Sequence, residues 1–147
     1  MQNGRIGMKQ QKLKEKLDEI VSYYDEFLED FPKESVFEEE RLVRRGIEKT
    51  VELMADAIID AAMTLISMDN MNKPKDSREA IRLLEEKGVL SRKTSLKVQD
   101  FISFRNLLVH RYARIDESKE YQSLSTEHQD IIAFVKEVET YLKRKKS

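Results

Sequence analysis

Four side chains that could carry out acid–base or anion-binding chemistry fall within one short stretch, RNLLVHRY, from Arg105 to Tyr112. A histidine titrates at roughly pH 6.5, near cellular pH, so His110 could accept or donate a proton during a reaction. An arginine stays charged, and its planar fork can bind two phosphate oxygens, which suits Arg105 to anion stabilisation. Asn106 lies one helical turn before His110 and could orient its ring. The stretch is therefore a candidate catalytic or phosphate-binding site.

The same residues also fit a purely structural role. A single histidine in an apolar helix is more often a hydrogen-bonded core residue than a catalyst. Arg105 could equally stack on an aromatic ring or pair with a carboxylate. One arginine and one histidine within a turn and a half of helix form a weak pattern, and their spacing alone leaves both interpretations open.

If this stretch is helical, its polar residues point in several directions. Each residue turns by roughly 100°, so Asn106, His110 and Arg114 share one face. Arg105 and Tyr112 lie on another face. Apolar residues fill the sectors between them: Phe101, Ile102, Phe104, Leu108 and Val109. A helix with so little solvent-facing surface is usually buried on more than one side. We therefore expect a two-fold homodimer with this helix near the axis, where the polar residues of both copies could line one cleft.

Composition limits the class of protein. The 147 residues favour a single domain over 1–147, with flexible tails expected at 1–8 and 143–147. The net charge is −1, so any polyanion site must be a local patch. Cysteine is absent, which excludes disulfides, thiol catalysis and cysteine-ligated metals. No run is long and apolar enough for a membrane span, and the N-terminus lacks the apolar region of a signal peptide. We expect a cytoplasmic protein with no metal or cofactor.

The elements that position these residues are helices. Two prolines and four glycines punctuate the chain, and strand-like alternation is absent. Apolar residues recur at steps of three and four, which predicts an all-α, up-and-down bundle of about five helices. The expected helices run from about Met8 to Glu29, Glu34 to Asp69, Asp76 to Gly88, Arg92 to Arg114 and Glu117 to Arg144. A kink or break in the second helix is expected near Gly46.

Local signals mark the two ends of the short third helix and the start of the fourth. Asp76 and Glu79 form a capping-box pattern, and Gly88 suits a helix C-terminus. Ser91 is a candidate N-cap for the helix that carries the motif.

Two further residues need an interpretation. His128 occupies a seam position of the last helix, so we expect a hydrogen-bonded, buried histidine there rather than a functional one. Asp60 lies in the apolar stretch AIIDAAM. It could face solvent, or it could be a buried carboxylate that pairs with an arginine near the site.

The stretch LLEEKGVLSRKTSLKVQDFISFRNLLVHRYARID, Leu83 to Asp116, resembles the core signature of the HepT-like subgroup of HEPN domains. Those proteins carry a glycine-containing turn, followed by a helix with arginine, four residues, histidine, one residue and tyrosine. The upstream RLVRRGIEKTVELMADAIIDAA is similar to the family's second helix, and the resemblance extends from about Leu13 to Leu142. One position departs from the pattern: the residue between the histidine and the tyrosine is often acidic, and here it is Arg111.

The resemblance implies a helical dimer that acts as a metal-independent endoribonuclease, commonly the toxin of a toxin–antitoxin pair. It implies that Arg105 and His110 of both copies line the cleft, with Asn106 and Tyr112 in support. It also implies a partner, a small MNT-type nucleotidyltransferase antitoxin that can block the toxin by transferring AMP to Tyr112. A binding module without nuclease activity, which partners such a nucleotidyltransferase, is the alternative. A third possibility is a structural dimer in which the motif only packs.

A mechanism for RNA cleavage follows from these residue types. RNA carries its own nucleophile, the 2′-OH, so the enzyme needs a base and positive charge beside the phosphate. His110 suits the first role and Arg105 the second. The expected products are a 2′,3′-cyclic phosphate and a 5′-OH. Arg111 and Arg114 could add phosphate contacts, or could be ordinary surface charges.

Overall fold

The computed structural model describes the backbone of residues 2–110 and 115–146, and the side chains of 7–110 and 115–145. It contains six helices in this part of the chain: α1 (Gln2–Asp30), α2 (Glu34–Glu39), α3 (Arg41–Met68), α4 (Ser77–Glu86), α5 (Arg92–His110) and α6 (Glu117–Lys146). The described residues form no strand. The expected all-α class is therefore confirmed. The flexibility of residues 1–8 and 143–147 and the two-fold dimer stay predictions.

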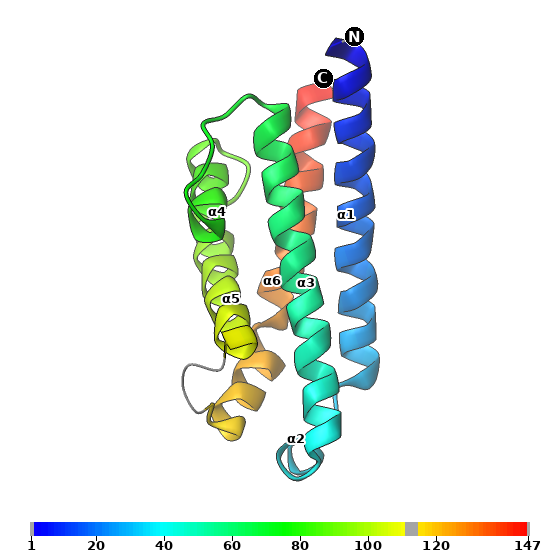
Figure 1. Ribbon diagram of the computed structural model, residues 1–147, viewed down its shortest axis with the longest axis vertical. Coiled ribbons are helices and arrows are strands. Elements are labelled where there is room, and N and C mark those ends of the chain that lie inside the picture. Colours follow the sequence, from blue (N-terminus) through cyan, green and yellow to red (C-terminus); the bar gives the residue numbers. More distant parts are fainter. Residues whose placement is uncertain (1, 111–114, 147) are drawn as a thin grey trace.

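The four long helices lie roughly along one axis and alternate in direction (Figure 1). Helix α1 packs along α3, and α5 and α6 complete the bundle on the other side of α3. Helix α1 begins and α6 ends at the same end of the molecule, while α5 runs away from that end and stops at His110. None of the helices that the structure describes is both long and apolar enough to cross a bilayer.

The expected single helix from Glu34 to Asp69 is divided into α2 and α3. The division falls at Glu40, whose backbone is extended at φ −101° and ψ 96°, and not at Gly46, which lies within α3. Arg44 donates from Nη1 to the carbonyls of Phe37 and Glu38 at 2.8 and 2.9 Å, so it satisfies groups that the break leaves without helical partners. The side chain of Phe37 is fully buried. Burial of this ring therefore requires a change of chain direction that the local sequence does not announce.

Helix α3 is the central helix of the core. Its buried side chains come from nearly every turn: Ile47, Glu48, Val51, Met54, Ala55, Ala57, Ile58, Ala61, Ala62, Thr64, Leu65 and Ile66. Four of these residues are alanines, and small side chains let neighbouring helices approach closely. From α1, Leu13, Leu17, Ile20 and Phe27 pack into the same core. A helix buried on several sides is a rigid base for any side chain that it directs toward α5.

Hydrogen bonds at the ends of α4 match the local signals in the sequence. The Asp76 carboxylate accepts from the backbone N–H of Glu79 at 2.8 Å, which confirms the N-cap. The Glu79 carboxylate accepts from the N–H of Lys75 at 2.7 Å, one residue earlier than in the usual capping box. Gly88 has φ +83° and directs the chain out of α4, as expected for a glycine C-cap.

The first turn of α5 is fastened to α6. Ser91 Oγ accepts from the N–H of Thr94 at 3.2 Å, which confirms the predicted N-cap. The Glu137 carboxylate on α6 accepts from the N–H of Ser91 at 2.7 Å and from the Thr94 hydroxyl at 2.5 Å. These bonds fix where α5 begins, and therefore which way each later residue of the helix points.

Candidate functional site

Arg105 lies on the side of α5 that faces α3, where it meets an acidic residue. Its Nε and Nη2 atoms each lie 3.0 Å from Oδ1 of Asp56, a residue of α3. Its Nη1 atom donates to Oδ1 of Asn106 at 3.1 Å. The Arg105 side chain is 24% exposed. The guanidinium is therefore held from two directions, by a carboxylate on another helix and by the amide of its neighbour.

Asn106 is placed differently from the role that its spacing suggested. A residue one turn before His110 could orient the imidazole ring, but the Asn106 amide oxygen accepts from Arg105. The Asn106 side chain is exposed on α5. Its described contact thus supports the arginine of the motif.

His110 is the last described residue of α5 and is exposed. Five residues separate it from Arg105, so the two side chains leave the helix about 140° apart and roughly 7.5 Å apart along the axis. A helix C-terminus favours positive charge, which suits a histidine that gains a proton there. Tyr112, Arg111 and Arg114 lie outside the described residues. The structure therefore places Arg105 and His110 on different faces of one helix end.

The carboxylate that pairs with Arg105 was not identified from the sequence. Asp60 was considered for this role, but it is exposed and lies 3.5 Å from Lys16 Nζ, which makes it a solvent-side residue. Asp56 lies one turn earlier on α3, in the same stretch MADAIID. Two aspartates at this spacing share one helix face, and that spacing was the available signal.

His128 is a hydrogen-bonded, partly buried residue, as expected. Its Nδ1 atom lies 2.7 Å from the hydroxyl of Tyr24, and its ring centroid lies 5.8 Å from that of Phe27. Burial lowers the pKa of His128 below that of a free histidine, because the charged form would lose its hydration. Burial also raises the pKa of Tyr24, with a smaller contribution from the charge of Asp25. These contacts describe a structural histidine.

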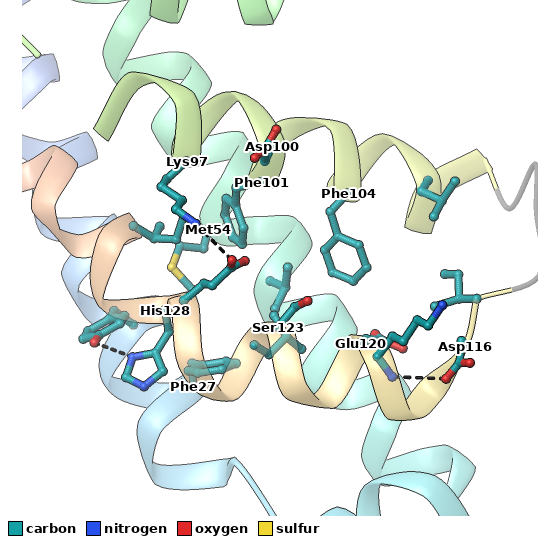
Figure 2. Close-up of a pocket in the computed structure, with 18 residues that line it drawn as sticks. Phe27, Met54, Lys97, Asp100, Phe101, Phe104, Asp116, Glu120, Ser123 and His128 are labelled. Carbon is teal, nitrogen blue, oxygen red and sulfur yellow. Dashed lines mark hydrogen bonds and ion pairs between the residues drawn. The ribbon is translucent and has the colours of Figure 1, made fainter. Parts of the chain in front are cut away.

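A pocket of about 510 Å³ lies between α5 and α6, with α1 and α3 behind it (Figure 2). Its wall is mainly apolar and includes Phe27, Met54, Phe101 and Phe104. An ion pair between Lys97 and Glu127, at 3.0 Å, bridges the two helices beside it. The lining does not include Arg105, Asn106 or His110, so the pocket and the motif use different faces of α5. The sequence gave no sign of the pocket, since a void depends on how far apart packed helices lie.

Acidic side chains are scattered over the molecule rather than clustered. Among the described residues, no group of three or more His, Asp or Glu side chains is arranged to hold a metal ion.

Comparisons with known proteins place the chain in a family. Residues 13–138 match the model of the family described as Ribonuclease HepT-like. The structure resembles a tri-AMPylated HEPN toxin of Shewanella oneidensis, solved in complex with an MNT antitoxin, with a TM-score of 0.83 at 16% identity over 88% of this chain and 97% of that chain. It also resembles YutE, a cytosolic Bacillus subtilis protein of unknown function, with a TM-score of 0.74 at 17% identity over 90% of this chain and 92% of that one.

These identities establish a shared fold, and no curated protein matches the sequence. The family model covers most of the chain, including the helix that carries Arg105 and His110. The resemblance that the motif suggested is therefore confirmed, and the chain belongs to the HepT-like ribonuclease family.

Proposed function

We propose that this protein is a metal-independent endoribonuclease in which Arg105 and His110 are the catalytic residues. The observation that carries the proposal is the arrangement at the end of α5: an exposed histidine, one and a half turns after an arginine whose guanidinium is held by Asp56 and Asn106. Membership of the HepT-like family supports the reaction class. Both residue types match the needs of RNA cleavage.

In the proposed reaction, the 2′-oxygen of RNA attacks the adjacent phosphorus. His110 removes the 2′-proton as the bond between that oxygen and phosphorus forms. Arg105 donates hydrogen bonds to the phosphoryl oxygens and stabilises the charge that grows on them. The bond from phosphorus to the 5′-oxygen breaks, and the leaving oxygen takes up a proton. The products are a 2′,3′-cyclic phosphate and a 5′-OH, and Arg111 and Arg114 add phosphate contacts.

A two-fold homodimer completes the proposed site. Arg105 and His110 leave α5 about 140° apart, so the arginine of one copy and the histidine of the other are suited to meet across an axis. Leu96 and Val109, also on α5, are 46% and 40% exposed, and apolar side chains of this size favour burial. The second copy would cover them.

We also propose that the protein is the toxin of a toxin–antitoxin pair. The Shewanella oneidensis relative is a HEPN toxin in complex with an MNT antitoxin, and it carries AMP. A partner nucleotidyltransferase of this type would transfer AMP to Tyr112. The added phosphate is negative and would compete with RNA for Arg105.

The decisive experiment is RNA cleavage by the purified protein in EDTA, with end-group analysis of the products. We expect the wild type to leave 2′,3′-cyclic phosphate ends and His110→Ala to cleave about 10²- to 10⁴-fold more slowly, as for loss of a general base. His128→Gln is the matched control, because it replaces the other histidine, which contacts Tyr24. Equal cleavage by wild type and His110→Ala would overturn the mechanism.

The second candidate is a binding module without nuclease activity. The complex between the Shewanella oneidensis relative and its MNT partner favours this candidate as much as the first. Absence of cleavage by a folded, unmodified dimer would select it.

A further inference from the structure

We infer that Asp56 is a positioning residue of the same site, which fixes the Arg105 guanidinium in the orientation that meets a phosphate. The inference rests on the proposed ribonuclease function and adds a residue from outside the motif. Asp56 and Arg105 lie 49 residues apart in sequence and on different helices. Nothing in the motif itself points to Asp56.

The hydrogen-bond geometry supports this role. A guanidinium has five N–H groups, which lie in one plane. Asp56 accepts from Nε and from Nη2, both at 3.0 Å, and Asn106 accepts from Nη1 at 3.1 Å. Within the described part of the chain, one N–H therefore remains on each of the two Nη nitrogens. Two donors on neighbouring nitrogens are suited to two oxygens of one phosphate.

The position of Asp56 makes it a rigid support. It is a residue of α3, and both of its sequence neighbours, Ala55 and Ala57, are buried in the core. Arg105 has a long, flexible side chain, so an unsupported guanidinium would lose much freedom when it bound a phosphate. A carboxylate on a buried helix removes part of that freedom in advance, which is the usual benefit of a preorganised site.

The exposure of the pair argues against a mainly stabilising role. The Asp56 side chain is 42% exposed and that of Arg105 is 24% exposed. Ion pairs this open to solvent contribute little to folding, because water screens them and long side chains must be ordered. The effect of Asp56 should therefore be visible in the reaction rather than in stability.

The chain provides a matched control on the same helix. Asp60 lies one turn after Asp56, is 54% exposed, and pairs with Lys16 rather than with Arg105. Asp60→Ala removes the same side chain from the same helix face without touching the site. Any difference between the two variants then reports the contact with Arg105.

The test compares kcat, KM and thermal stability for wild type, Asp56→Ala, Asp56→Asn and Asp60→Ala. We expect Asp56→Ala to lower kcat by about 100-fold, as for a misplaced catalytic group, with an unchanged or lower KM because a negative charge near the phosphate is gone. Asp56→Asn should stay within roughly tenfold of wild type, since its amide oxygen still accepts, though more weakly. Asp60→Ala should match wild type. Unchanged or faster cleavage by Asp56→Ala, at equal stability, would overturn the inference.

A second readout separates this inference from the proposed function. If the wild type does not cleave RNA, the proposed function fails, and the Nε–H NMR signal of Arg105 then decides the positioning. We expect this proton to exchange with water faster in Asp56→Ala than in wild type and Asp60→Ala. Equal exchange in all three proteins would contradict the positioning role independently of any activity.

Discussion

The two halves of α5 differ in how they are held. In the first half, Thr94 and Ser95 are buried, and Glu137 on α6 accepts hydrogen bonds from Ser91 and Thr94. In the second half, after the buried Ile102, polar side chains reach solvent or the edge of α3. The comparison teaches that one continuous helix separates anchoring from chemistry by position along its length. Substitutions in the first half should change stability, and those in the second half should change activity.

The largest expected effect is on the reactive half. Arg105→Lys keeps the charge but loses the planar fork, so cleavage should fall by about 10²- to 10³-fold, as when one transition-state donor is removed. The unfolding free energy should change by less than about 0.5 kcal/mol. Rate measurements and thermal melts check both values. The control is Arg92→Lys, the same substitution at an exposed arginine in the first turn of α5. Equal losses in the two variants would erase the proposed separation.

A smaller effect is expected in the anchored half. Glu137→Ala removes the acceptor for the Ser91 N–H and the Thr94 hydroxyl, and loss of buried hydrogen-bond partners costs about 1–3 kcal/mol. Denaturant unfolding should show this loss, while the cleavage rate of the folded protein stays near that of wild type. Glu139→Ala, at an exposed position of α6, is the control for removing a glutamate. A Glu137→Ala protein of normal stability would show that these bonds do not anchor α5.

The two histidines extend the comparison to pH. The pKa of His128 is lowered by burial, so the unfolded chain binds a proton more readily than the folded one. The unfolding free energy should therefore fall as pH drops below about 6.5, the pKa of an unfolded histidine, by at most about 1.4 kcal/mol per pH unit. His128→Gln should reduce this slope and His110→Ala should not. Unfolding curves between pH 7.5 and 5.5 test the assignment, and equal slopes in all three proteins would refute it.

The smallest effects concern two glycines near the ends of the long elements. Gly88 has φ +83° and precedes α5, so Gly88→Ala should destabilise the protein by about 1–2 kcal/mol. Gly46 lies inside α3, and a Cβ there would meet no atom within 4 Å. Gly46→Ala should therefore stabilise the protein by roughly 0.5–1 kcal/mol. Thermal melts of the two variants should move in opposite directions, and a shared direction would contradict the helix ends described above.

Much of the fold follows from local rules in the sequence. The caps at Asp76, Gly88 and Ser91 were predicted because each depends on a few neighbouring residues. The break at Glu40 was missed because it depends on the burial of Phe37 against distant rings such as that of Tyr121, 5.4 Å away. Local propensity cannot report such a contact.

The candidate site was predicted only in part. Its residue types and their spacing on α5 could be read from the sequence, and so could the presence of an aspartate on a nearby helix. Which aspartate meets Arg105 depends on the rotation of α3 relative to α5. A quarter turn of either helix would have placed Asp60 or neither carboxylate at the guanidinium. The dimer that would join Arg105 to the other copy's histidine stays a prediction.

The shared end at which α1 begins and α6 finishes has a practical consequence (Figure 1). Helix α5 points away from that end, so a tether joined near Gln2 or Lys146 leaves the motif facing solution. The protein can therefore be arrayed on a sensor surface through either terminus, and RNA or a nucleotidyltransferase flowed over it can reach α5 unobstructed.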